Sequence, residues 1–78
     1  MKNSMYATEF FQKGKVGLKI RYGSPDAPLV SIFIFSKGAM YAWGEEEGTK
    51  RRIFLFLRGG FLVDKERGEF NALEVFPA

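Results

Sequence analysis

The stretch that decides the fold is RRIFLFLRGG, residues 51–60. Its β-branched and aromatic residues favour a β-strand, in which successive side chains point to opposite faces of the sheet. One face of this strand is aliphatic and consists of Ile53, Leu55 and Leu57. The other face places two phenylalanines between two arginines, namely Arg52, Phe54, Phe56 and Arg58. The first face predicts a core, and the second face raises the question of function.

The same alternation occurs in two earlier segments, KVGLKIRY at residues 15–22 and LVSIFIFSK at residues 29–37. Each therefore predicts a strand with one aliphatic face. Combined with residues 51–58, the segments predict a core made of Val16, Leu18, Ile20, Val30, Ile32, Ile34, Ile53, Leu55 and Leu57.

The remaining segments are shorter. Residues 39–43 and 72–76 are expected to form strands, and residues 61–70 a hairpin that turns at 65–68. Residues 23–28 (GSPDAP) and 44–50 (GEEEGTK) are typical of turns. Residues 5–13 are compatible with a short helix, capped by Asn3 or Ser4 and ending at Gly14, or with a strand, and the strand is preferred.

Five or six strands with at most one short helix, in a chain of 78 residues, predict a single small β domain over residues 1–78. The expected architecture is mainly β: a small five- to six-stranded barrel or a strongly bent antiparallel sheet, OB-like or SH3-like. Since an open sheet of this size exposes edges that pair with other chains, closure or a homodimer is expected.

Composition excludes several classes of site. The chain has no cysteine and no histidine, so zinc sites built on these residues and histidine-based acid–base catalysis are excluded. The acidic residues fall in turns or singly on strands, without the spacing of a catalytic carboxylate pair. We therefore expect no enzyme activity, no cofactor and no metal. The apolar runs are far shorter than the roughly 20 residues of a membrane span, and nothing indicates secretion, so a cytoplasmic location without membrane contact is expected.

The second face of the strands combines aromatic and basic residues. Single-stranded nucleic acid is bound by this combination, because bases stack on rings while lysine and arginine contact phosphates. The net charge of +3 and the pI near 9.4 agree with such a ligand. The predicted stacking residues are Phe33, Phe35, Phe54, Phe56 and Tyr41. The predicted phosphate contacts are Lys15, Lys19, Arg21, Lys37, Lys50, Arg51, Arg52 and Arg58.

The leading hypothesis is therefore a protein that binds single-stranded DNA or RNA with little sequence specificity. It requires the acids to lie away from this face, chiefly in the turn at residues 45–47 and between residues 64 and 69. An alternative is a small protein-interaction module, such as a phage or mobile-element inhibitor or adaptor, that docks a partner through the same face. In a third interpretation the phenylalanines form a second core layer, because a strand that is apolar on both faces is usually covered on both. Trp43 is expected to anchor the core.

Overall fold

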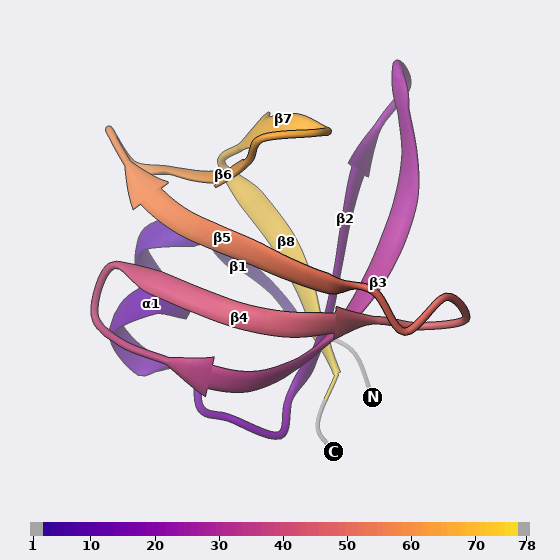
Figure 1. Ribbon diagram of the computed structural model, residues 1–78. Coiled ribbons are helices and arrows are strands. Elements are labelled where there is room, and N and C mark those ends of the chain that lie inside the picture. Colours follow the sequence, from indigo (N-terminus) through magenta and orange to yellow (C-terminus); the bar gives the residue numbers. More distant parts are fainter. Residues whose placement is uncertain (1–2, 77–78) are drawn as a thin grey trace.

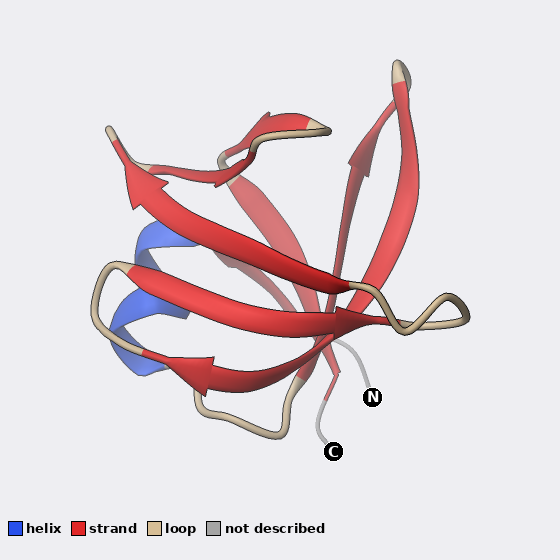
Figure 2. Cartoon of the chain, in the orientation of Figure 1, coloured by secondary structure: helices blue, strands red, loops and turns tan. Residues whose placement is uncertain are grey.

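The computed structural model describes residues 3–76, and Figures 1 and 2 show a β-rich chain with one short helix. Its elements are β1 (Asn3–Tyr6), α1 (Ala7–Lys13), β2 (Lys19–Ser24), β3 (Ala27–Lys37), β4 (Tyr41–Glu46), β5 (Arg52–Arg58), β6 (Phe61–Asp64), β7 (Gly68–Phe70) and β8 (Ala72–Phe76).

All eight strands belong to one antiparallel sheet with the order β1-β8-β2-β3-β4-β5-β6-β7. The sheet curls, so that β3, β4 and β5 lie in front of β1 and β8 in Figure 1. It is not closed into a barrel, because β1 and β7 are its two ends and do not pair with each other. Helix α1 instead contacts β1 on one side and β5 and β6 on the other, and so bridges the two sides of the curl.

The mainly β class and the single short helix are confirmed, whereas the strand number was predicted too low. The strand preferred for residues 5–13 is wrong for most of its length, because residues 7–13 form α1. Ala7, Phe10 and Phe11 have the spacing i, i+3, i+4 and are all buried on one face of the helix. The helix ends at Gly14, whose N–H donates to the Phe10 carbonyl at 2.7 Å. Within residues 3–76, no helix is long and apolar enough to cross a membrane.

The aliphatic face predicted from the alternation forms the inside of the curl. Six of its nine residues are buried, and Leu18 and Leu57 pack partly buried against them. Val16 is 57% exposed, so its assignment to the core is wrong. The reason is that β2 begins at Lys19 and Val16 lies in the preceding loop. Each fully buried aliphatic side chain contributes about 1.5–3 kcal/mol before chain entropy is counted.

Two turns are shorter than predicted. Strands β2 and β3 continue to Ser24 and Ala27, which leaves only residues 25–26 as the turn of a projecting hairpin. Strand β4 likewise continues to Glu46, because the long strand β3 offers it partners as far as Ile32. Gly44 is needed at that point, since a Cβ there would lie 2.8 Å from the Phe33 carbonyl oxygen. Residues 44–46, which the sequence assigned to a turn, therefore belong to the sheet.

Candidate functional site

The outer surface of β3, β4 and β5 carries a group of rings. We call this group the outer aromatic face; it consists of Phe33, Phe35, Tyr41, Trp43, Phe54 and Phe56. Five of the rings are 38–47% exposed, and Phe56 is half-buried. All predicted stacking residues thus lie on one surface. A second core layer within the described chain is excluded for the five exposed rings, and the expected burial of Trp43 is wrong.

Strand register explains why the rings meet. Trp43 pairs directly with Phe54 across β4 and β5, and Tyr41 pairs with Phe56. The Trp43 and Phe54 ring centroids are 4.9 Å apart, and those of Phe54 and Phe56 are 6.0 Å apart. Cross-strand aromatic pairs of this kind stabilise a sheet and hold the rings in place. Phe54 is the centre of the cluster, since Tyr41 also lies 6.5 Å from it with the planes 20° apart.

Three of the predicted cations lie over rings of this face. The Arg52 guanidinium lies 5.5 Å from the centroid of Phe35, and Arg58 lies 5.6 Å from that of Phe56. The Lys19 ammonium lies 5.9 Å from the Phe33 centroid. These distances allow cation–π attraction, which orients the cations along the aromatic surface.

Four predicted phosphate contacts are engaged by acids. The pairs are Lys19–Glu47 (3.4 Å), Arg21–Glu74 (3.7 Å), Arg51–Glu66 (2.7 Å) and Arg58–Glu69 (2.9 Å). The expectation that the acids lie away from the basic face is therefore wrong. Glu45 also belongs to the outer surface, because β4 places it between Phe33 of β3 and Arg52 of β5. The face has much less uncompensated positive charge than the sequence indicated.

Lys37 has a structural role instead of a surface one. Its ammonium donates to the Phe11 carbonyl at 2.5 Å, at the end of α1, and to the Gly38 carbonyl at 3.2 Å. Burial disfavours its charged form and lowers its pKa. Besides Lys37, the predicted cations without an acidic partner in the part of the chain that the structure describes are Lys15, Lys50 and Arg52.

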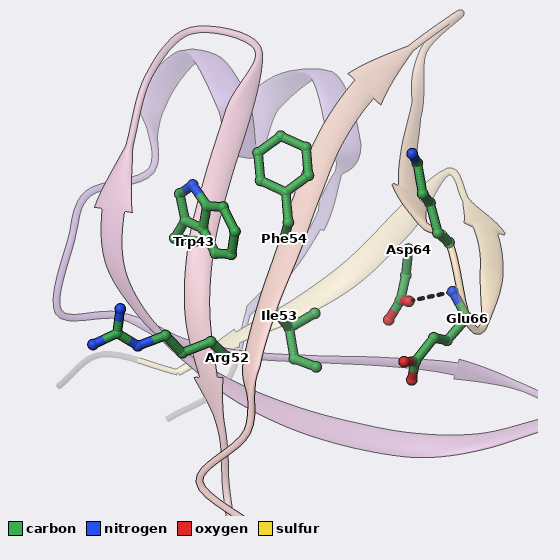
Figure 3. Close-up of a pocket in the computed structure, with 7 residues that line it drawn as sticks. Trp43, Arg52, Ile53, Phe54, Asp64 and Glu66 are labelled. Atoms are coloured by element: carbon green, nitrogen blue, oxygen red, sulfur yellow. Dashed lines mark hydrogen bonds between the residues drawn. The ribbon is translucent and has the colours of Figure 1, made fainter.

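A pocket of about 360 Å³ adjoins the outer aromatic face at the first half of β5 (Figure 3). It forms because β6 pairs with β5 only from Leu55 onward, so that residues 52–54 have no strand neighbour on that side. The pocket is lined by Trp43, Arg52, Ile53, Phe54, Asp64, Lys65 and Glu66. Sequence reasoning missed Lys65 and Glu66, which were assigned only to a turn.

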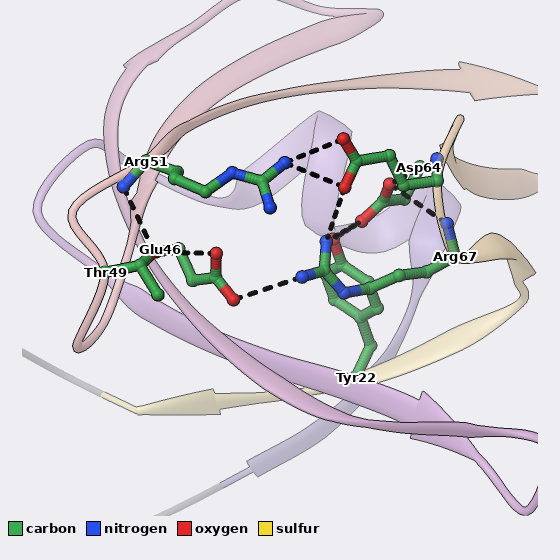
Figure 4. A network of polar contacts seen from close by, with 7 residues as sticks. Tyr22, Glu46, Thr49, Arg51, Asp64 and Arg67 are labelled. Atoms are coloured by element: carbon green, nitrogen blue, oxygen red, sulfur yellow. Dashed lines mark hydrogen bonds and ion pairs between the residues drawn. The ribbon is translucent and has the colours of Figure 1, made fainter.

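A buried polar network holds the turn between β6 and β7 that forms one wall of this pocket (Figure 4). The Tyr22 hydroxyl donates to Asp64 Oδ2 at 2.5 Å, and Arg67 donates to the same oxygen at 3.1 Å. Arg67 also donates to Glu46 Oε2 at 3.1 Å, which connects the turn to β4. Burial acts to raise the pKa of Asp64, but hydrogen bonds from Tyr22, the Glu66 N–H and Arg67 outweigh it and leave the pKa below its usual range. Desolvation, followed by the hydrogen bond to Asp64, raises the pKa of Tyr22, which stays protonated.

The comparisons with known proteins give no family: no family model, curated protein or solved structure matches this chain. Within residues 3–76, no group of three or more acidic residues is arranged to hold a metal ion. The function must be inferred from the surface chemistry described above.

Proposed function

We propose that the outer aromatic face binds single-stranded DNA or RNA, with little sequence preference along most of its length. The observation that supports this best is the exposure of five large rings on three adjacent strands, with Arg52 over one of them. Soluble domains seldom leave so many aromatic side chains together in water without a ligand for them.

Base stacking on the rings supplies most of the expected binding free energy. Each base that stacks on a protein ring contributes about 1–3 kcal/mol, and any base can do so because each has an aromatic face. Phe54 is the best candidate for a central contact, since three neighbouring rings surround it on the surface. The OB-like and SH3-like architectures expected from the sequence use such sheet faces, and the curled sheet offers a comparable surface.

Electrostatics limits how strongly salt should weaken binding. Each phosphate neutralised on a single strand adds about −0.7 to the slope of log K against log salt. If Lys15, Lys50 and Arg52 contact phosphates, the slope is about −2; eight free cations would give roughly −6. The exposed ion pairs are individually weak, so each one exchanged for a phosphate makes the slope steeper.

The first test is fluorescence anisotropy with a labelled oligothymidylate at several salt concentrations. We expect binding with a slope near −2, and we expect Phe54→Ala to weaken it at least tenfold while the protein stays folded. Tyr6→Ala is the matched control, because Tyr6 is an exposed ring on β1 outside the face. Failure of the wild-type protein to bind at 50 mM salt would rule out this function.

A second candidate is favoured by the ion pairs. Because acids compensate four of the cations, the face also suits a protein partner, and aromatic residues with arginine are typical of interface centres. A second copy of the chain is one such partner, in a homodimer. Sedimentation velocity of the free protein, compared with Phe54→Ala, tests it: a dimer that the variant disrupts supports this use of the face, and a monomer at all concentrations excludes self-association.

A further inference from the structure

The pocket beside Phe54 differs from the rest of the outer face because it contains hydrogen-bonding groups. Phe54 and Trp43 form its aromatic side, and Ile53 lies between the two sides. The end of β6 supplies Asp64, and the turn after it supplies Lys65 and Glu66 (Figure 3). Its volume of about 360 Å³ is at the low end of the roughly 300–1,000 Å³ typical of ligand pockets. A flat aromatic group can therefore rest against Phe54 with its edge toward the turn.

Only one of the two carboxylates can exchange its present partner for a ligand. Asp64 is saturated: its Oδ1 accepts from the Glu66 and Arg67 N–H groups, and its Oδ2 accepts from Tyr22 and the Arg67 guanidinium. Both oxygens of Glu66 accept from a single nitrogen, Arg51 Nη2, at 2.7 and 2.9 Å. Arg51 Nη2 therefore occupies the fork between the two oxygens, where a ligand with two adjacent donors would bind, and the lone pairs left on the outer sides point away from each other. Because this ion pair is exposed and individually weak, such a ligand can take the place of Arg51 Nη2 on Glu66.

The charge at the pocket suits a nucleotide. Arg51 and Arg67 both lie close to the Glu66 carboxylate, at 2.7 and 3.9 Å, so this carboxylate does not repel a phosphate as a free one would. Lys65 is exposed on the same turn and has no acidic partner within residues 3–76. Lys65 and Arg52 line the pocket and offer positive charge to the phosphates on either side of a bound base.

We propose that this pocket takes the base of one nucleotide of the bound strand and prefers guanine. Among the bases, guanine alone presents two adjacent donors on its Watson–Crick edge, the N1–H and the N2 amino group, which match the two oxygens of Glu66. Adenine and cytosine place an acceptor beside their amino group, and the single N–H of thymine or uracil lies between two carbonyls, so each opposes a carboxylate with an acceptor. The inference rests on the proposed function and adds a position of base selectivity to it.

The test compares three oligonucleotides by anisotropy: oligothymidylate, the same strand with one central guanine, and the same strand with inosine in place of guanine. We expect the guanine strand to bind about five- to tenfold more tightly than oligothymidylate, the low end for a bidentate base contact, and inosine to lose most of that gain. In Glu66→Gln the ratio of the guanine-strand affinity to the oligothymidylate affinity should fall below about twofold. The reason is that the NH2 group of the new glutamine would face a donor of the base. Glu69→Gln is the control. It also removes one negative charge, from the pair that Glu69 of β7 forms with Arg58 of β5, and it should leave the ratio unchanged.

Each outcome decides between the two proposals. If oligothymidylate and the guanine strand bind equally well, or if Glu66→Gln keeps the preference, base selection at this pocket is overturned while the proposed function stands. If no oligonucleotide binds, the proposed function fails and the base pocket fails with it. Loss of the preference in Glu66→Gln but not in Glu69→Gln establishes the contact.

Discussion

Removing one hydroxyl from the buried network is the sharpest test of what holds the pocket wall in place. In Tyr22→Phe the ring keeps its packing against Phe70, with centroids 4.9 Å apart, and only the donor to Asp64 is lost. A hydrogen bond to a charged group contributes about 1.5–3 kcal/mol. At 0.05–0.15 kcal/mol per residue, a chain of 78 residues has a total stability of roughly 4–12 kcal/mol. The stability lost with this hydrogen bond is therefore a large fraction of the total free energy of unfolding.

Urea denaturation at pH 7 measures the effect. With a slope of about 1 kcal/mol per molar urea for a small domain, the midpoint of Tyr22→Phe should fall by roughly 1.5–3 M. Tyr41→Phe is the control, because its ring lies on the outer surface and is 42% exposed. A wild-type midpoint in Tyr22→Phe would refute the assignment of stability to this hydrogen bond.

The pH dependence gives an independent check. The pKa of Asp64 is lowered in the folded state, so the carboxylate stabilises the fold above its unfolded pKa of about 3.9. That contribution is lost as the pH falls through the lower, folded pKa. The gap between wild type and Tyr22→Phe should therefore be constant near neutrality and shrink below about pH 4, because the Tyr22 hydroxyl helps to lower the pKa. A gap that is unchanged down to pH 2 would contradict this reasoning.

Two further substitutions test features of the fold. Lys37→Met should lower stability by about 0.5–1.5 kcal/mol, measured by thermal melting, because the Phe11 carbonyl at the end of α1 loses its donor; an unchanged melting temperature would contradict this role. Gly44→Ala should destabilise by about 1–3 kcal/mol in urea, since the added methyl would press on the β3 backbone and an isoleucine side chain there; a neutral effect would show that β3 and β4 separate easily.

The sequence predicted the two faces of the sheet better than the ends of its strands. In β3 and β5 the side-chain period follows from the backbone pleat, so alternation alone assigned Ile32, Ile34 and Leu55 correctly to the core. The end of β4 could not be predicted in this way, because residues 44–46 have no alternating apolar pattern and stay in the sheet through pairing with β3 and, for 44 and 45, with β5. Helix α1 had a local signal, the spacing of Ala7, Phe10 and Phe11, but seven residues are few enough that the same segment also fits a strand.

The rings of the candidate site were predictable and their electrostatic surroundings were not. Whether a ring lies on the outer surface depends on parity within its own strand. The partners of the cations depend on which strands become neighbours: β8 pairs beside β2 and brings Glu74 to Arg21, and the extended β4 leads into Glu47, which reaches Lys19. Such pairings join residues that are far apart in the sequence, so no local pattern predicts them.

The topology also restricts how the outer aromatic face can be used. The single helix packs its buried residues against the inside of the curl, so no element of the described chain is left to cover the exposed rings. A standard protein interface buries about 800 Å² per partner, which is about a sixth of the 4896 Å² that this chain exposes. An area of that size centred on Phe54 would include most of the outer aromatic face. A homodimer formed through these rings and a nucleic-acid strand stacked on them would therefore exclude each other, because both need Phe54 and Trp43 uncovered.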